Sequence, residues 1–204
     1  MQSPLQKLLI IKHSKVAYMA DFAVYALLIG LMTSSLILFP VRMSALSIVF
    51  YIILGGFSWT LMEYVLHRWV LHQWPPFCEW HHEHHRQPKA LICTATLVSL
   101  SAIGLTVYLP LYWAASAEVA TCFTLGLLIG YLAYAVTHHA IHHWPNSGLA
   151  WLNKRQVIHC LHHVSSNHSF GVTSNVWDVV LGTHFNSPVV KSLENSAHID
   201  LQRE

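Results

Sequence analysis

The chain has 204 residues, of which 54% are hydrophobic and only 10% are charged, with a formal net charge of +2. Soluble domains average about 25% charged residues because their surfaces need charge to stay in water, so the composition indicates a bilayer environment. The small net charge and the lack of a basic patch with interleaved aromatics exclude nucleic-acid binding. The four cysteines form no CxxC pair, which argues against a disulfide framework or a thiolate zinc site. The feature that a function must explain is the set of seventeen histidines.

Four apolar runs approach the roughly 20 residues that a helix needs to cross a bilayer. They are residues 22–39, 44–66, 91–113 and 117–137. The short link "AASAE" joins the last two runs into a helical hairpin, and no long apolar run follows residue 143. We therefore predict an all-α fold, an integral-membrane four-helix bundle with a cytoplasmic helical cap built from residues 67–90 and 138–186.

The predicted organisation is a single membrane-bound domain over residues 1–186, followed by a flexible tail over residues 187–204. Lys and Arg occur before the first run, after the second and after the fourth, whereas the first turn has Arg42 alone and the last link has neither. The positive-inside rule then places both termini and residues 67–90 in the cytoplasm, of either a bacterial inner membrane or an endoplasmic reticulum. The histidines after the second and fourth helices would therefore share one face of the membrane and could meet in one site.

Ten of the histidines fall into four motifs on this predicted face. They are HxxxxH at His67 and His72, HxxHH at His81, His84 and His85, HxxxH at His138 and His142, and a second HxxHH at His159, His162 and His163. Residues three or four apart share one face of a helix, so an HxxHH helix can serve two neighbouring metals. His67 and His72 diverge by about 140° on a straight helix. We therefore expect them to flank a site from two directions, or the helix to end between them.

Neutral imidazole is the commonest protein ligand and suits iron, zinc, copper and nickel. The motifs hold too many imidazoles for one ion, so two ions with about five each is a reasonable division. His139 and His143 have the same spacing as His138 and His142, one residue out of register, and spacing does not choose between the two stripes. Three acids could offset the charge of the ions, namely Glu63, Glu83 and Asp178. Glu63, four residues before His67, could also hydrogen-bond a ligand ring.

The remaining histidines lie outside these motifs or beside them. We interpret His13 and His198 as surface residues. His82 stays open between a ligand and a neighbour of the ligands. His168 and His184 stay open between the surface, the surroundings of the metals and the substrate pocket.

Five segments together resemble the fatty acid hydroxylase/sterol desaturase superfamily of integral-membrane di-metal oxygenases. They are "EYVLHRWVLH" (63–72), "HHEHH" (81–85), "YAVTHHAIHH" (134–143), "HCLHH" (159–163) and "FGVTSNVWDVVLGT" (170–183). The last segment and the spacing from His142 to His159 look most like the catalytic domain of fatty acid 2-hydroxylases. The resemblance implies ten metal ligands, which are His67, His72, His81, His84, His85, His138, His142, His159, His162 and His163. The resemblance thereby favours the stripe of His138 and His142 over that of His139 and His143.

The resemblance also implies an activity: the oxygen-dependent hydroxylation of, or desaturation at, an unactivated C–H bond of a lipid that enters from the bilayer. Two iron ions would be the cofactors and O₂ the cosubstrate, and zinc, which has no redox chemistry, could replace iron in purified protein. Many of these hydroxylases carry a fused cytochrome b5 domain. No such segment is evident before residue 20 or after residue 186, so we expect a separate cytochrome b5-like or ferredoxin-like electron donor.

Two alternatives remain open at this point. A carotenoid or sterol hydroxylase or desaturase with the same metal centre is suggested by the short gap between His72 and His81. A histidine-rich metal transporter or sensor would be a different class of protein. It would need ionisable residues along an intramembrane path, and Asp21, Glu63 and Glu118 instead lie near the ends of the predicted helices.

Overall fold

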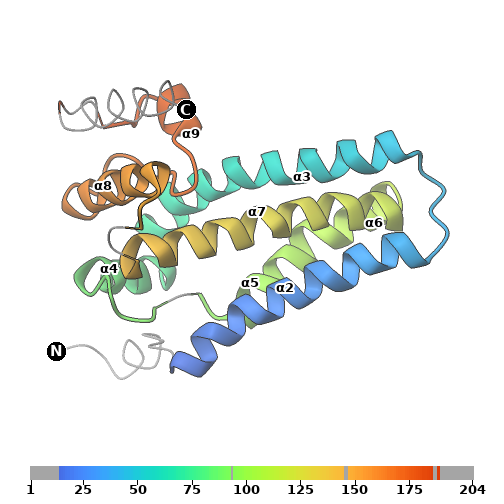
Figure 1. The fold of residues 1–204 in the computed structure, drawn as a ribbon, viewed down its shortest axis with the longest axis horizontal. Helices are drawn as coiled ribbons and strands as arrows, with labels where there is room; N and C mark the ends of the chain where they lie inside the picture. Colours follow the sequence, from blue (N-terminus) through green and yellow to red (C-terminus); the bar gives the residue numbers. More distant parts are fainter. Residues whose placement is uncertain (1–13, 93, 145–146, 186–187, 189–204) are drawn as a thin grey trace.

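The computed structural model describes residues 14–92, 94–144, 147–185 and 188, and within these residues the fold is helical. Four helices are long and apolar enough to cross a membrane, and they lie side by side as an elongated bundle (Figure 1). Their bounds are Lys15–Leu38, Ala45–Leu71, Thr96–Ala114 and Ala117–His143. The prediction of an all-α fold with four membrane helices is thereby confirmed. The chain has the architecture of a multi-pass membrane protein.

Three of the four spans begin at a serine whose side chain accepts a hydrogen bond from a backbone N–H of the first helical turn. These are Ser14 before α2 (Lys15–Leu38), Ser44 before α3 (Ala45–Val65) and Ser116 before α7 (Ala117–His143). A serine at this position satisfies a backbone donor that the helix itself leaves unpaired. The first span starts earlier than its apolar run because Ser14 provides this start signal.

The third span is not a regular α-helix. It consists of α5 (Thr96–Ile103), the π-helical segment η2 (Gly104–Tyr108) and α6 (Leu109–Ala114). Pro110 near the start of α6 has no N–H to donate to the preceding turn, and such a loss is commonly absorbed by a local change of helix type.

The closest packing in the bundle is between α3 and α7. A Cβ atom added at Gly55 on α3 or at Gly126 on α7 would collide with the backbone of the other helix. Small residues that allow backbones to approach closely are the usual contact of membrane helices. One turn further along α7, Gly130 leaves room for the ring of Trp59. The two spans that carry the HxxxxH and HxxxH motifs are therefore fixed against each other at short range.

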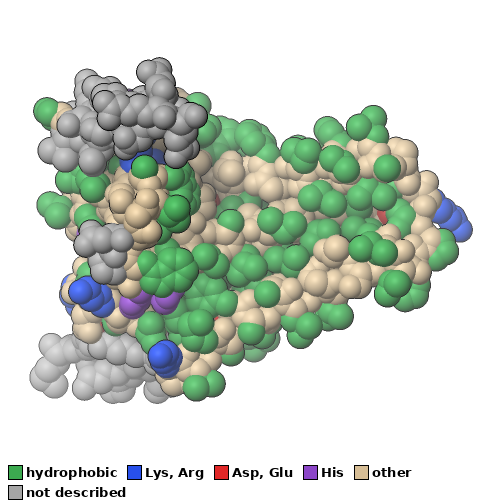
Figure 2. Space-filling view, viewed as in Figure 1, with side chains coloured by type: hydrophobic (Ala, Val, Ile, Leu, Met, Phe, Trp, Pro, Cys, Tyr) green, Lys and Arg blue, Asp and Glu red, His purple; other side chains and the backbone are tan. Residues whose placement is uncertain are grey.

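The surface along the bundle is apolar, as Figure 2 shows by the green side chains that cover its length. Large hydrophobic residues such as Leu31, Ile53 and Leu105 are 59%, 65% and 66% exposed. These side chains would face lipid in a bilayer, where burial inside the protein is not required. Two acids of the apolar helices, Asp21 and Glu63, are 5% and 3% exposed and so point inward.

The segments outside the bundle lie together at one end of it (Figure 1). They are η1 (Leu66–Leu71), which continues α3, followed by α4 (Phe77–Arg86), α8 (Ala150–Val164) and α9 (Val176–Val180). The predicted cap began at residue 138, but α7 runs without a break to His143. His138 and His142 therefore lie on the membrane helix itself. Two expectations lie outside the described residues: His13 and His198 as surface residues, and the tail over 187–204 apart from residue 188.

Candidate metal centre

His67 and His72 lie on a π-helical segment, η1, at the end of the second span. Their rings are stacked, with centroids 5.2 Å apart and an angle of 22° between the ring planes. The expectation that they diverge, or that the helix ends between them, is therefore wrong. A π-helix has a hydrogen-bonding period of five residues instead of four, and this wider turn brings side chains five apart onto one face.

Five histidines from three elements form the first group. Their ligand nitrogens all lie within 4.8 Å of one another, and the members are His67, His72, His81, His85 and His162. The Nε2 atom of His81 is 3.0 Å from the Nε2 atoms of both His67 and His85. The Nε2 atoms of His72 and His162 are 3.1 Å apart. The end of α3, helix α4 and helix α8 thus converge on one point.

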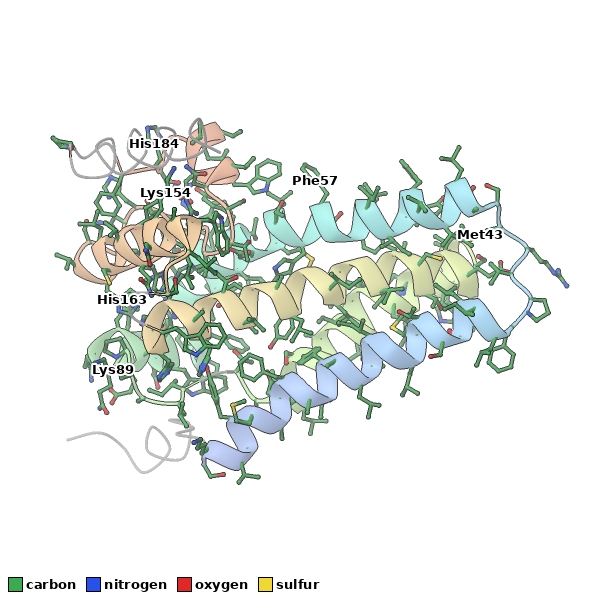
Figure 3. The ribbon with its side chains drawn as sticks, viewed as in Figure 1. Met43, Phe57, Lys89, Lys154, His163 and His184 are labelled. Carbon is green, nitrogen blue, oxygen red and sulfur yellow. The ribbon has the colours of Figure 1, made fainter. Side chains whose placement is uncertain are left out.

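Four further histidines form the second group within the same 4.8 Å limit, namely His84, His138, His142 and His159. The Nε2 atom of His142 lies 3.0 Å from that of His159 and 3.3 Å from that of His138. His163 adjoins this group, because its Nε2 atom is 3.0 Å from that of His159. Figure 3 labels His163 on α8, at the end of the bundle where α4 and α7 also lie.

The two HxxHH helices connect the groups. In α4, His85 belongs to the first group and His84 to the second, and in α8 His162 and His163 divide in the same way. The rings of His85 and His163 stack across the boundary, with centroids 4.1 Å apart and planes 7° apart. Adjacent residues on a helix point about 100° apart, so each pair can face two neighbouring points.

The spacing of the nitrogens fits metal ions. With a metal–nitrogen bond of about 2.1 Å, ligands at right angles are about 3.0 Å apart, tetrahedral ligands about 3.4 Å, and opposite ligands about 4.2 Å. The observed separations of 3.0–3.3 Å match neighbouring ligands of a five- or six-coordinate ion. Hydrogen bonds cannot satisfy all these contacts, because each Nε2 carries at most one proton. The two groups could therefore hold metal.

Two backbone carbonyls orient histidines of the first group. The Nδ1–H of His67 donates to the carbonyl oxygen of Phe170 at 2.5 Å, and the Nδ1–H of His162 donates to that of His168 at 2.7 Å. A proton on Nδ1 leaves the Nε2 lone pair free for a metal, and such an outer contact is the usual partner of a metal-binding histidine. Both carbonyls belong to the loop between α8 and α9, and the sequence analysis had assigned no role to the backbone of this loop.

Two of the three predicted acids hold this loop instead of contacting a ligand ring. The carboxylate of Asp178, which is fully buried, accepts from the backbone N–H groups of Phe170 and Gly171 at 2.9 and 2.8 Å. Glu63 accepts from the N–H groups of Val172 and Thr173 at 2.5 and 2.9 Å. The expectation that Glu63 hydrogen-bonds a ligand ring is not met, and its effect on His67 passes through the loop.

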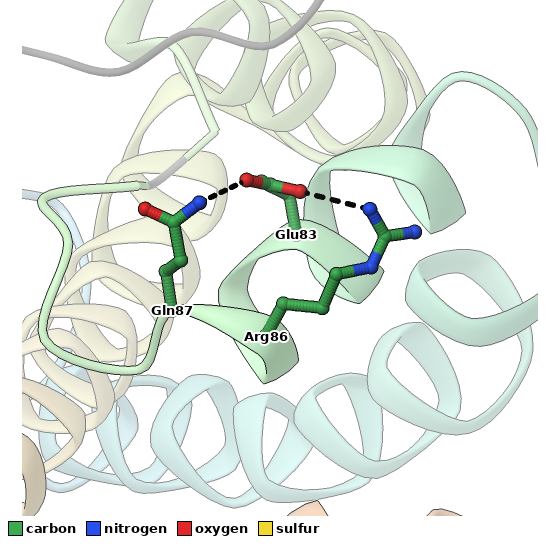
Figure 4. Close-up of polar contacts among 3 residues, drawn as sticks. All are labelled: Glu83, Arg86 and Gln87. Atoms are coloured by element: carbon green, nitrogen blue, oxygen red, sulfur yellow. Dashed lines mark hydrogen bonds and ion pairs between the residues drawn. The ribbon is translucent and has the colours of Figure 1, made fainter. Parts of the chain in front are cut away.

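The third acid, Glu83, fixes the end of α4. Its two oxygens accept from the side chains of Arg86 at 3.2 Å and Gln87 at 2.5 Å, as Figure 4 shows. The pair with Arg86 is partly exposed, so it is worth little as an ion pair by itself. Glu83 lies between the histidines of the HxxHH motif in the sequence but belongs to neither histidine group.

The histidines of the cap are held in their neutral form. Burial, reinforced by neighbouring histidines, lowers the pKa of His84 and His85 to about 2 and that of His72 to about 3. Burial lowers the pKa of His162 to about 4, against a raising effect of its hydrogen bond to the carbonyl of His168. Because a metal binds only the neutral ring, protons do not compete for these nitrogens near neutral pH.

The histidines that the sequence left open lie outside both groups. His82 is exposed. The rings of His139 and His143 stack on each other with centroids 4.5 Å apart, and His139 contacts Tyr18 on α2. His184 is exposed on the segment after α9 (Figure 3). His168 is also exposed, and only its backbone carbonyl serves the site.

A cavity of about 380 Å³ opens beside the histidines, between the spans and α4. Its walls are mostly apolar, with Trp59, Met62 and Ile103 among them. Members of both groups also line it, namely His67, His81, His84 and His138. An apolar cavity bounded by potential metal ligands can hold a hydrocarbon chain next to a metal.

Comparisons with known proteins agree on one family. The family model "Fatty acid hydroxylase" matches residues 52–183. A dihydroceramide fatty acyl 2-hydroxylase of Arabidopsis thaliana is 30% identical over 148 residues, covering 65% of this chain and 59% of that protein. A ceramide very long chain fatty acid hydroxylase of Saccharomyces cerevisiae is 32% identical over 165 residues, covering 70% of this chain and 40% of that protein.

The similarity extends to a human protein and to a solved structure. Human fatty acid 2-hydroxylase is 31% identical, covering 64% of this chain and 38% of that protein. The structure of full-length Scs7p, in which only the hydroxylase domain is visible, matches with a TM-score of 0.66 and 26% identity. That match covers 88% of this chain and 70% of the other. The chain spans 38–59% of the length of these curated relatives, and it belongs to the fatty acid hydroxylase family.

Proposed function

We propose that the protein is an O₂-dependent hydroxylase of lipid acyl chains that uses two iron ions. The observation that carries this proposal is the convergence of two groups of histidine nitrogens on one apolar cavity, in a chain of the fatty acid hydroxylase family. The ligands would be the ten histidines of the four motifs, five nearer to each ion. When bound, iron supplies the redox chemistry that activates O₂, which zinc lacks.

The contribution of the protein chain is to orient the histidine rings and to hold the acyl chain beside them. The loop carbonyls of Phe170 and His168 hold the rings of His67 and His162 so that their Nε2 atoms would be free to bind the ions. The apolar cavity positions an acyl chain next to His67 and His84 and excludes bulk water from the reacting carbon. An acyl chain can enter this cavity from the bilayer, since the helices around it are membrane spans.

Electrons would come from a separate donor protein, cytochrome b5-like or ferredoxin-like, at the cytoplasmic side. The positive-inside rule supports this orientation, with the metal end of the bundle in the cytoplasm. A single domain over residues 1–186 would contain the whole reaction site. Of the two alternatives, the fatty acid and ceramide hydroxylases among the relatives favour an acyl chain over a carotenoid or sterol. Family membership favours an enzyme over a transporter.

The test is mass spectrometry of lipids from matched cells with and without the gene, grown under isotopically labelled O₂. We expect acyl chains that carry one labelled hydroxyl only where the gene is expressed. Unchanged lipids in cells where the protein is present and contains iron would overturn the proposal. Label-free hydroxylated lipids would overturn the O₂-dependent reaction, because the oxygen would then come from water.

A further inference from the structure

The outward face of the short helix α9 is apolar. Its exposed side chains, and that of the residue directly after it, are hydrophobic and between 46% and 64% exposed, namely Val176, Val179, Val180 and Leu181. We call these four residues the α9 face. The acid of the helix, Asp178, is fully buried. A helix at a water-facing surface has the opposite arrangement, with polar side chains outside and apolar ones inside, so the α9 face is not the kind of surface that water covers.

Helix α9 lies along one side of α3. The indole N–H of Trp177 donates to the hydroxyl of Thr60 at 2.9 Å, and its ring centroid is 5.9 Å from that of Phe57. Just after α9, the hydroxyl of Thr183 is 3.0 Å from that of Tyr64. Phe57, Thr60 and Tyr64 are spaced three and four residues apart, so they form one face of α3. Helix α9 is therefore held against that face at both of its ends.

These contacts lie within the second membrane span. Thr60 is seven residues before His67, which places it about 10 Å from His67 along the helix axis, towards the middle of the span. Phe57 is 56% exposed and Ile53, one turn earlier, is 65% exposed, and both belong to the surface that would face lipid. Figure 1 shows α9 beside the end of α3, and Figure 3 labels Phe57 on α3. The α9 face therefore continues the surface by which the bundle meets lipid.

Arg68 marks the polar boundary of this surface. Its Nη1 atom donates to the hydroxyl of Tyr64 at 2.7 Å, and its guanidinium carbon lies 5.0 Å from the centroid of the Trp69 ring. Arginine at the end of a membrane helix and aromatic rings beside it are typical of the level where acyl chains meet headgroups. The contacts of α9 at Phe57 and Thr60 lie two to three turns deeper along the span. This depth favours acyl chains over water as the cover of the α9 face.

We propose that the α9 face lies in the acyl-chain region of the bilayer, in the leaflet nearest to the histidine groups, and that lipid thereby helps to hold the metal centre. Helix α9 carries Asp178, which accepts from the N–H groups of Phe170 and Gly171. The carbonyl of Phe170 in turn orients His67. Lipid that keeps α9 against α3 therefore keeps the loop in the position that orients this ring. Part of the predicted cytoplasmic cap is thus a membrane-bound element, which goes beyond the proposed hydroxylase function.

The placement of α9 is tested by photo-crosslinking of the full chain in its membrane. A photoreactive amino acid takes the place of Val180 in one variant and of Val164 in another, and mass spectrometry identifies the adducts after illumination. Val164 is the matched control, because it too is an exposed valine at the last residue of a helix, α8. We expect adducts with lipid acyl chains at position 180 and not at position 164. Equal lipid adducts at both positions, or adducts at position 180 only with a second copy of the chain or another protein, would overturn the placement.

The link to the metal centre is tested with Val180→Asp and Val164→Asp. A charge in the acyl-chain region is costly, so Val180→Asp should displace α9 and weaken metal binding about 10- to 100-fold, as the loss of an outer contact does. Val164→Asp should bind metal like the wild type, and equal affinities in the two variants would overturn the link. If Val180→Asp does not fold, Val180→Thr, which adds a hydroxyl at similar volume, should show a smaller loss. A wild-type protein that hydroxylates no lipid would overturn the proposed function and leave the placement of α9 intact.

Discussion

The Nδ1–H of His67 donates to the carbonyl oxygen of Phe170 at 2.5 Å, although the two residues are 103 positions apart. The backbone N–H of the same Phe170 donates to Asp178 at 2.9 Å. The N–H of Gly171, which is in the same peptide unit as the Phe170 carbonyl, also donates to Asp178, at 2.8 Å. A buried carboxylate, one peptide unit and an imidazole are thus linked in series. This arrangement transmits the position of Asp178 to the ring of His67 without any direct contact between them.

The first prediction concerns this series. Asp178→Asn replaces an accepting oxygen by an NH₂ group that faces backbone or hydroxyl donors, so the loop should shift and His67 should lose its orientation. Loss of such an outer contact typically lowers metal affinity about 10- to 100-fold. Metal titration of the chelated protein checks this. Glu79→Gln, which makes the same charge change on α4, should bind metal normally, and equal affinity in both variants would contradict the role of Asp178.

The second prediction compares a proposed ligand on α8 with an exposed histidine on α4 that belongs to neither group. His163→Ala should release metal from the second group and reduce hydroxylation by more than the roughly 100-fold of an outer contact, because the Nε2 atom next to His159 is removed. His82→Ala, at an exposed position, should leave metal content and product unchanged. Elemental analysis and lipid mass spectrometry measure both. Full activity of His163→Ala would remove His163 from the ligand set.

The third prediction tests the contact between α3 and α7. Gly126→Ala places a methyl group against the backbone of α3, and such overpacking typically costs about 1–3 kcal/mol. The thermal midpoint in detergent should fall, with loss of metal as the helices separate. Gly30→Ala is the control, since a Cβ at Gly30 meets nothing within 4 Å. A midpoint of Gly126→Ala equal to that of Gly30→Ala would show that the close approach is not required.

The fourth prediction concerns the metal-free protein. Burial lowers the pKa values of His72, His84, His85 and His162 to between about 2 and 4 in the folded state, whereas they are near 6.5 when the chain unfolds. The unfolded state therefore binds more protons as the pH falls below about 6.5, and folding stability should decrease with falling pH from there. Thermal unfolding after chelation, measured between about pH 7.5 and 5, checks the direction. A flat profile would contradict neutral buried histidines.

The metal-binding pattern could be extracted from the sequence because it depends on local spacing. Residues three and four apart lie on one face of any α-helix. The spacing within the two HxxHH motifs and the HxxxH stripe therefore predicts which histidines of each motif point in the same direction. Apolar run lengths likewise predicted four membrane helices without tertiary information. The choice of His138 over His139 did not follow from spacing, since both stripes satisfy the same period. That choice came from the family resemblance, and packing against Tyr18 explains why His139 faces elsewhere.

Other features depend on contacts between distant segments, and local patterns carry no signal for them. The π-helical turn that aligns His67 with His72 has no reliable sequence signature. The loop carbonyls that orient His67 and His162 are backbone atoms, which every residue has. Glu63 and Asp178 were recognised as acids near the site, but their partners are N–H groups of a loop. The sequence by itself thus determined the spacing of the histidine motifs and the number of membrane helices. Only the tertiary structure decided how the histidine side chains are oriented and which of them line the cavity. Both depend on chain segments that meet only after folding.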